Sequence, residues 1–190
     1  MDMGSKGEHS RQRIIDAADR LFYIKGFNQT SFSDIAEAAG VARGNFYYYF
    51  KTKDDILQAV IEKRAEDIRR MLEDWEASYP DPRDRLRRYV TILTKEQQHI
   101  EKFGCPMGTL CTELAKLRHA RQTQAAEMFE LFRCWLEKQF RLLGHKDDAR
   151  DLALHLMARE QGAAIIANAY HDSAFLQREA DDTLRWLDTV

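Results

Sequence analysis

The sequence predicts an all-α fold of nine helices, and three observations support this prediction. Apolar residues recur at helical spacing along nearly the whole chain of 190 residues. The chain contains only 9 Gly and 3 Pro, too few for a sandwich or barrel of short strands, which needs a turn about every 8–12 residues. Capping residues also precede several of the helical patterns. No strand is therefore expected.

The first third of the chain is predicted to hold three short helices. Gly26 ends the first of them, an amphipathic helix that buries one face. Ser31–Asp34 has the form of a capping box, so a second helix begins there and Gly40 ends it. A third helix occupies Val41–Phe50, because a new capping box at Thr52–Asp55 follows it directly.

The other six helices are longer on average, and turn formers separate them. Pro80 and Pro82 end the first of these, and Gly104-Cys105-Pro106 interrupts the chain after the next. Gly144 ends the long helix that follows. These six helices are predicted at residues 52–79, 86–100, 107–117, 123–143, 147–170 and 174–189.

The composition excludes several classes of protein. A net charge of −2 and a pI of about 6.3 argue against a protein that coats nucleic acid by bulk electrostatics. The first 53 residues nevertheless carry eight Lys/Arg against six Asp/Glu, which is compatible with an end that approaches phosphates. Three cysteines are an odd number, typical of reduced thiols in the cytoplasm. No secretion signal or membrane span is recognisable, so a cytoplasmic chain with no membrane partner is expected.

The segment 31–50 has the arrangement of a helix-turn-helix, with a capped helix, a tight turn at Gly40 and a second short helix. The second helix carries residue types that read base edges. Arg43 offers a guanidinium fork that matches guanine O6 and N7, and Asn45 offers a carboxamide that matches adenine N6 and N7. These two residues are predicted to contact bases.

Three consecutive tyrosines follow in the same helix. Tyr47, Tyr48 and Tyr49 each combine a ring that packs on a sugar with a hydroxyl that bonds a phosphate. Ser33 from the preceding helix and Lys53 from the following one are expected to hold further phosphates. An alternative for the tyrosines is that one or two of them pack against the first helix instead.

The run SFSDIAEAAGVARGNFYYYFKTK at residues 31–53 resembles the TetR/AcrR family of bacterial repressors. The resemblance implies an N-terminal helix-turn-helix DNA-binding domain at 1–52 and a C-terminal effector-binding and dimerisation domain at 53–190. It also implies a homodimer on a palindromic DNA operator, released by a small effector that is largely apolar. Tyr47 and Lys53 match the positions of phosphate contacts. The sequence departs from the pattern at Ala42, where the family usually has Ser or Thr.

A second copy is expected to pack against the last two predicted helices. They are rich in small and apolar residues, which permit close helix approach, and a two-fold four-helix interface fits this pattern and the resemblance. The alternative is a helix buried within the chain. The candidate interface residues are Leu152, Leu156, Ala163, Ile166, Ala167, Leu176, Ala180, Leu184 and Leu187.

Aromatic and Met side chains on the middle helices are candidates for the wall of an effector cavity. Core packing is the alternative for any one of them. The helix break before Met107, which a plain bundle does not need, and the resemblance favour the cavity. The candidate lining residues are Trp75, Tyr89, Phe103, Cys105, Met107, Leu110, Cys111, Phe129, Phe132 and Trp135.

Cys105 also supports an alternative function. It precedes a predicted helix, whose dipole favours a thiolate, so a repressor that senses oxidants or electrophiles through this cysteine stays open beside a plain packing role. An enzyme is a remote alternative, because the six His show no metal-ligand spacing and no Gly-rich phosphate loop is present. A helical adaptor that binds only protein would not explain the Arg, Asn and Tyr residues at 43–49. No cofactor, metal or catalytic residue is expected.

Overall fold

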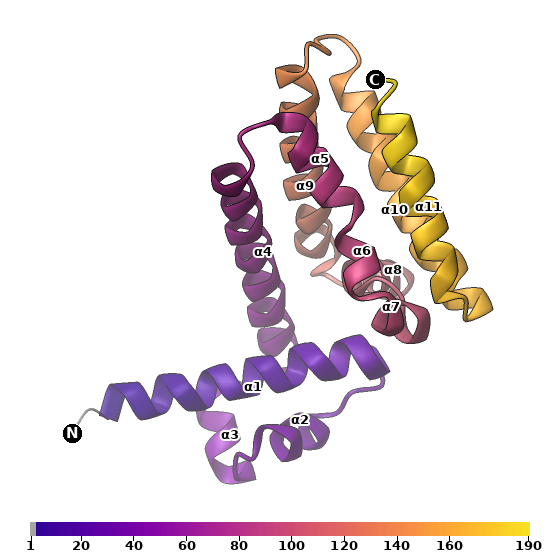
Figure 1. Cartoon of the computed structure of the whole chain (residues 1–190). Coiled ribbons are helices and arrows are strands. Elements are labelled where there is room, and N and C mark those ends of the chain that lie inside the picture. Colours follow the sequence, from indigo (N-terminus) through magenta and orange to yellow (C-terminus); the bar gives the residue numbers. More distant parts are fainter. Residues whose placement is uncertain (1–2) are drawn as a thin grey trace. The chain divides into compact units, whose positions relative to one another are not determined.

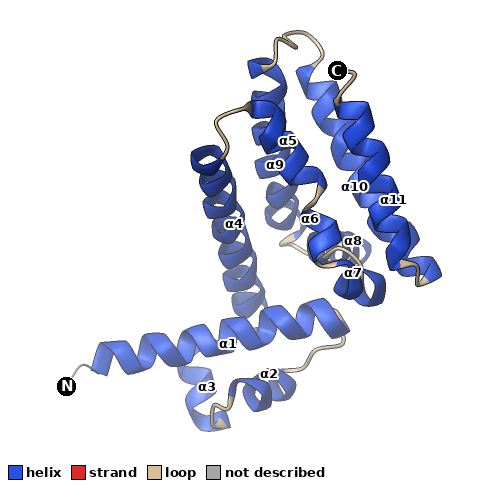
Figure 2. Cartoon of the chain, viewed as in Figure 1, coloured by secondary structure: helices blue, strands red, loops and turns tan. Residues whose placement is uncertain are grey.

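The computed structural model describes residues 3–190, without the side chains of residues 3–6 and Arg43, and the described part is entirely helical (Figure 2). Helices joined by loops and turns account for all of it, which confirms the predicted all-α class. The helices, labelled in Figure 1, are α1 (Met3–Lys25), α2 (Phe32–Ala39), α3 (Arg43–Tyr49), α4 (Lys53–Ser78), α5 (Pro82–Val90), α6 (Ile92–Lys95), α7 (Gln97–Phe103), α8 (Pro106–Lys116), α9 (Gln122–Leu142), α10 (Ala149–Tyr170) and α11 (Ser173–Leu187).

The described part of the chain holds eleven helices where the sequence predicts nine, because α5, α6 and α7 replace one predicted helix. The hydroxyl of Thr91 donates to the carbonyl of Arg88 at 3.0 Å, and the hydroxyl of Thr94 donates to the carbonyl of Thr91 at 2.9 Å. Threonine side chains that bond to the preceding turn bend helices in this way. The backbone N–H of Glu96 bonds to Leu93 three residues earlier, the tighter pattern that ends a helix.

The chain divides into two compact units. The first unit comprises residues up to Ala65 together with Thr109–Ala125. Helices α2 and α3 lie on one side of α1 in this unit (Figure 1). Its core consists of the fully buried apolar side chains of α1, α2, α3 and the start of α4, among them Ile14, Ile35 and Phe46.

The second unit comprises residues 66–108 and 126–190. Helices α10 and α11 run side by side in it (Figure 1), and α11 also packs on α5 and α7. Two hydrophobic clusters form its core. The larger includes Leu86, Leu136 and Leu156, and the smaller includes Ile100 and Leu176. The helix-turn-helix segment and the predicted effector region thus each have a core of their own.

Candidate functional site

The turn between α2 and α3 is built by backbone geometry and one arginine. The predicted capping box is present, since Ser31 and Asp34 exchange hydrogen bonds at the start of α2. Gly40 ends α2 in the left-handed conformation at φ 62°, where a residue without Cβ is favoured. The Arg13 guanidinium of α1 donates to the carbonyls of Ala39 and of Gly40, the latter at 3.0 Å. A Cβ on Gly40 would approach Arg13 Nη2 to 2.7 Å.

Helix α3 is anchored by the aromatic side chains on its inner face. Phe46 is only 1% exposed, and its ring meets the edge of Phe32 at 5.2 Å between centroids. Phe50, just after α3, is also buried. No side chain caps the start of α3 at Ala42, as expected from the missing hydroxyl. The position of α3 therefore depends on the buried rings rather than on an N-cap.

The outer face of α3 presents an amide and aromatic side chains. Tyr48 is 81% exposed and Tyr47 is 55% exposed, while Asn45 is exposed beside them. Tyr49 is half-buried, and its ring meets Tyr48 edge-on at 5.3 Å. A Cβ on Gly44 would meet no atom within 4 Å. Large exposed rings are uncommon on a surface without a partner, so this face is a candidate binding surface.

Lys53, which the sequence predicts to bind a phosphate, lies outside this face and is bonded within the chain. The Lys53 ammonium donates to the carbonyls of Phe27 at 3.0 Å, Thr30 at 3.1 Å and Asn28 at 3.5 Å, and it lies 4.3 Å from the centre of the Phe27 ring. These three acceptors match the three donors of an ammonium group. Lys53 therefore fixes the loop between α1 and α2, and the expected phosphate contact would compete with these bonds.

Two other predicted residues remain candidates. Ser33 is half-buried in the first turn of α2. The Arg43 side chain lies outside the described part of the structure, although its backbone begins α3.

Sequence reasoning missed a clamp on the loop between α1 and α2. The Glu113 carboxylate of α8 accepts hydrogen bonds from the backbone N–H groups of Phe27 and Asn28, each at 2.8 Å. His119, after α8, packs edge-on against Phe27 at 5.1 Å and lies 3.3 Å from Asp54. The partners are more than 60 positions apart in the sequence, and no local pattern announces such a contact.

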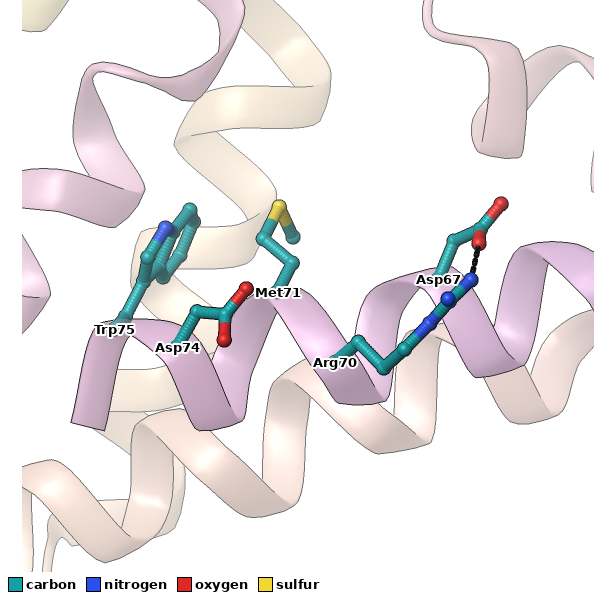
Figure 3. Close-up of a pocket in the computed structure, with 5 residues that line it drawn as sticks. All are labelled: Asp67, Arg70, Met71, Asp74 and Trp75. Carbon is teal, nitrogen blue, oxygen red and sulfur yellow. Dashed lines mark hydrogen bonds and ion pairs between the residues drawn. The ribbon is translucent and has the colours of Figure 1, made fainter. Parts of the chain in front are cut away.

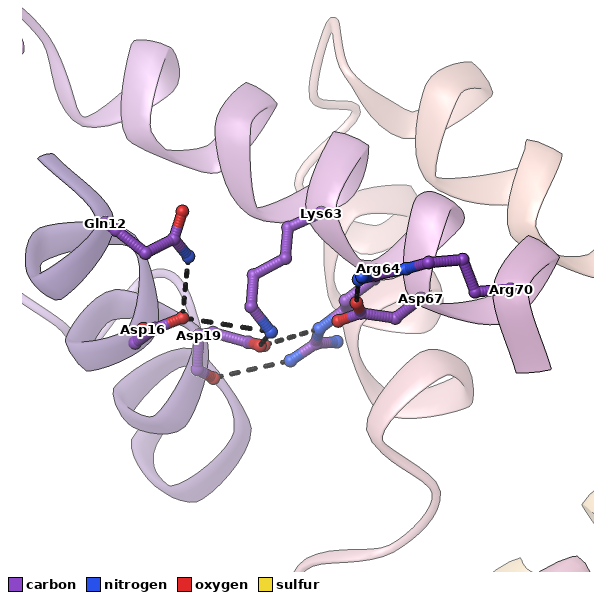
Figure 4. Close-up of polar contacts among 7 residues, drawn as sticks. All are labelled: Gln12, Asp16, Asp19, Lys63, Arg64, Asp67 and Arg70. Carbon is purple, nitrogen blue, oxygen red and sulfur yellow. Dashed lines mark hydrogen bonds and ion pairs between the residues drawn. The ribbon is translucent and has the colours of Figure 1, made fainter. Parts of the chain in front are cut away.

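Ion pairs hold α1 to the first half of α4. Asp19 accepts from Lys63 at 3.1 Å and from Arg64 at 2.6 Å, and Asp16 lies 3.9 Å from Lys63 (Figure 4). The Arg64 side chain is largely buried, so this pair is less screened than a surface ion pair. Helix α1 is thus bonded both to the turn after α2, through Arg13, and to α4, through Asp19.

The residues predicted to line an effector cavity fall into several environments. Trp75, Tyr89, Phe132 and Trp135 are buried in the larger cluster of the second unit, and Met107 and Phe129 pack against it. Cys105 belongs to the smaller cluster, and Phe103 is half-buried. Leu110 and Cys111 belong to the first unit.

Ring contacts join four of these side chains in pairs. Trp75 meets Trp135 edge-on at 5.7 Å, and Tyr89 meets Phe132 at 5.5 Å. An open pocket of about 310 Å³ lies along α4, and Trp75 is the one predicted residue among those that line it (Figure 3). The lining residues of this pocket are Asp67, Arg70, Met71, Asp74 and Trp75.

The residues predicted for a dimer interface are mostly interior. Leu152 and Leu184 are half-buried, and Ile166 is exposed. The other six are buried in the core of the second unit, as in the alternative of helices that pack within the chain. They are Leu156, Ala163, Ala167, Leu176, Ala180 and Leu187. Periodicity finds the apolar face of a helix but cannot tell whether the chain itself covers that face. The large apolar side chains exposed on α10 are Leu154, Ile165, Ile166 and Tyr170.

The described residues offer no group of three or more His, Cys, Asp or Glu side chains that could hold a metal ion. No helix among them is long and apolar enough to cross a membrane. A capped α2 that packs on α1, a tight turn and an α3 with exposed rings together define a DNA-binding protein of the helix-turn-helix class.

Comparison with known proteins specifies the family. Residues 14–60 match the model of the bacterial regulatory proteins of the tetR family. Residues 82–182 match the model of the LmrA/YxaF-like C-terminal domain of transcriptional regulators. The chain belongs to the TetR family of transcriptional regulators, with a C-terminal domain of the LmrA/YxaF type. This family is one of DNA-binding regulators rather than enzymes, so the enzyme and adaptor alternatives are set aside.

Individual relatives agree with this assignment. The chain is 28% identical to the HTH-type transcriptional regulator AcrR of Shigella flexneri over 172 residues, which cover 87% of this chain and 76% of that protein. It is 23% identical to LmrA of Bacillus subtilis over 161 residues, covering 83% and 86%. A TetR regulator from Chloroflexus aurantiacus has the same fold, with a TM-score of 0.85, 20% identity and coverage of 97% and 96%.

Proposed function

We propose that this regulator is a homodimeric, cytoplasmic repressor that a small, largely apolar effector releases from a palindromic operator. In this proposal residues 1–52 bind DNA, and residues 53–190 bind the effector and the second copy. The observation that supports it most is the outer face of α3, where Asn45, Tyr47 and Tyr48 are exposed on a helix that Phe46 anchors. A helix mounted in this way fits the major groove.

Each residue predicted to bind DNA has a proposed role. Arg43 and Asn45 read base edges, because a guanidinium fork and a carboxamide match guanine and adenine respectively. Tyr47, Tyr48 and Tyr49 contact the sugar-phosphate backbone or thymine methyl groups, and Ser33 contacts a phosphate. Lys53 acts as a positioning residue through its bonds to Phe27 and Thr30.

We place the contact with a second copy on the outer face of α10. Leu154, Ile165, Ile166 and Tyr170 are exposed on α10, and exposed apolar side chains of this size favour contact with a second copy. Leu152 and Leu184 are half-buried and border the core of the same unit. Analytical ultracentrifugation tests this placement, and Ile165→Asp is expected to convert a dimer into a monomer.

The DNA-reading role is tested with the DNA upstream of the protein's own gene. Asn45→Ala is expected to weaken binding to the operator by about 1–3 kcal/mol, with little change on random DNA, because a base contact contributes only to the matching sequence. Gln177→Ala, an exposed amide on α11, is the control and leaves both affinities unchanged. An equal loss on both DNAs would contradict a base-reading role for Asn45.

A thiol-sensing repressor is the second candidate. Cys105 is buried directly before α8, and the Gln161 amide nitrogen donates to its sulfur at 3.5 Å. Treatment with an alkylating agent is expected to weaken operator binding by the wild type but not by Cys105→Ser. Unchanged binding by the alkylated wild type would end this candidate.

A further inference from the structure

Gly44 of α3 lacks the structural reasons that account for other glycines of this chain. Gly26 and Gly40 have φ of 86° and 62°, in the left-handed region that favours glycine. At Gly108 a Cβ would approach Oε1 of Gln161 to 2.5 Å. Gly44 has no positive φ, and beyond its sequence neighbours and the backbone of α3 an added Cβ would meet no atom of the described residues within 4 Å. Neither backbone conformation nor packing among these residues therefore requires glycine at position 44.

A glycine at this position also has a cost for the folded chain. Gly44 lies in the first turn of α3, and a helical glycine loses more backbone freedom on folding than an alanine does. Alanine would fit the same place without displacing any described neighbour. Folding alone thus favours alanine over glycine here, so the benefit of glycine would come from a bound partner.

The open position lies on the face of α3 that is expected to bind DNA. Gly44 is exposed, and so is Asn45 next to it. Tyr48, four residues later and therefore on the same side of the helix, is 81% exposed. A glycine between longer side chains lets another molecule approach the helix backbone more closely than any other residue would.

Helix α3 has little freedom to shift within the protein if a methyl group is added at this position. Phe46 and Phe50 are buried, and the ring of Phe46 contacts Phe32 at 5.2 Å between centroids. Packed interiors tolerate such shifts poorly. A Cβ at position 44 would instead hold the outer face of α3 farther from DNA, and a hydrogen bond from Asn45 to a base needs a donor–acceptor distance of about 2.7–3.2 Å.

We propose that Gly44 determines how deeply α3 enters the major groove, and that a base edge of the operator lies in van der Waals contact with its Cα. The inference rests on the proposed reading of DNA by the outer face of α3, and it adds the position of closest approach. A complex with random DNA does not use this contact, because phosphates rather than base edges hold it. Gly44 is therefore a specificity-determining residue.

The test is Gly44→Ala, which adds the methyl group alone. Its affinity for the operator is expected to fall at least about tenfold, and its affinity for random DNA by less than about threefold, in fluorescence anisotropy at one salt concentration. Its thermal midpoint is expected to be unchanged or up to about 3 °C higher, because the methyl group meets no neighbour and alanine favours the helix. The larger Gly44→Leu is expected to lower the operator affinity further.

Gly7→Ala is the matched control. Gly7 is also helical, lies in α1 of the same unit and leaves an added Cβ without a neighbour within 4 Å, but it is not part of α3. This variant is expected to bind the operator and random DNA as the wild type does. A merely structural role of Gly44 would lower stability and affinity together, whereas the proposed role lowers the operator affinity alone.

Several outcomes would overturn the inference. They are an unchanged operator affinity in Gly44→Ala, an equal loss on operator and random DNA, an equal loss in Gly7→Ala, and a loss that accompanies a lower thermal midpoint. A wild type that does not prefer the operator to random DNA would overturn the proposed base reading as well. A wild type that prefers the operator, beside a Gly44→Ala that binds it equally well, would overturn this inference alone.

Discussion

Helix α3 and helix α10 depart from the usual distribution of side chains in opposite directions. The outer face of α3 exposes the rings of Tyr47 and Tyr48, whereas the inner face of α10 buries the carboxyl group of Glu160. Both departures cost free energy in the isolated chain, because rings favour burial and carboxylates favour water. A regulator of the TetR family binds DNA, and we infer that DNA compensates the departure at α3.

The exposed tyrosines of α3 and the buried Glu160 of α10 also differ in the residues around them. On the opposite face of α3 from the exposed tyrosines, Phe46 is buried and its ring contacts Phe32 edge-on. On α10 Glu160 is buried between apolar residues of the two hydrophobic clusters, and this burial raises its pKa to about 8. We therefore expect substitutions on the buried face of α3 to lower the free energy of unfolding and substitutions on its exposed face to weaken DNA binding. For Glu160 we expect the free energy of unfolding to depend on pH.

The largest expected effect is the pH dependence contributed by Glu160. Its pKa is about 8 in the folded protein, against an ordinary value of 4.5. The folded state therefore holds a proton that the unfolded state releases between these values, so stability falls as pH rises from about 4.5 to 8. The shift corresponds to a decrease on the order of 4–5 kcal/mol in the free energy of unfolding, complete above about pH 8.

Urea denaturation of the wild type and of Glu160→Gln at pH 5, 7 and 9 measures this contribution. The difference in unfolding free energy between the two proteins isolates it, because other titrating groups are common to both. The variant is expected to gain stability relative to the wild type as pH rises. A difference that stays constant from pH 5 to 9 would show that Glu160 is hydrated or paired in solution.

Opposite faces of α3 provide the next test. Phe46→Ala removes a ring that is almost completely buried, and it is expected to lower the free energy of unfolding by about 3–5 kcal/mol. Tyr48→Ala, on the exposed face, is expected to change it by less than about 0.5 kcal/mol while weakening operator binding. Thermal denaturation and fluorescence anisotropy with labelled operator measure the two effects. A strong loss of stability in Tyr48→Ala would contradict the assignment of that face.

Glu113 provides a comparison with Glu160, because its carboxylate accepts two hydrogen bonds. Glu113 accepts two backbone N–H groups at 2.8 Å, and Glu113→Gln keeps one acceptor oxygen while placing an NH₂ group against the other donor. This substitution is expected to destabilise the protein by about 1–3 kcal/mol in urea denaturation at pH 7. Glu127→Gln, an exposed carboxyl on α9, serves as the control. A neutral Glu113→Gln would mean that the two hydrogen bonds from Phe27 and Asn28 do not stabilise the loop between α1 and α2.

Much of the fold could be predicted from local signals. The capping box at Ser31, the left-handed Gly40 and the apolar spacing of α1 each act within a few residues, so the helix-turn-helix was identified with its turn in the right place. The division of one predicted helix into α5, α6 and α7 was missed. It depends on the hydroxyls of Thr91 and Thr94 bonding to the preceding turn, a choice that periodicity does not register.

The candidate sites were predictable only in part. Residue type and position mark Asn45, Tyr47 and Tyr48 as available for DNA, and the structure exposes all three. The sequence could not show that Lys53 is held by backbone carbonyls, nor that Leu156 faces the chain's own core. Those outcomes depend on which helices become neighbours, and the pairs concerned are far apart in the sequence.

By itself the sequence determined the helices, the turn that mounts α3 and the chemistry that α3 offers, because capping, backbone conformation and helical period are local properties of the chain. Only the tertiary structure decided which apolar faces are covered, which cations are already bonded and that Glu160 is buried. Burial and pairing arise when distant segments meet, and the free energy of a charged group depends on that environment rather than on its neighbours in the sequence.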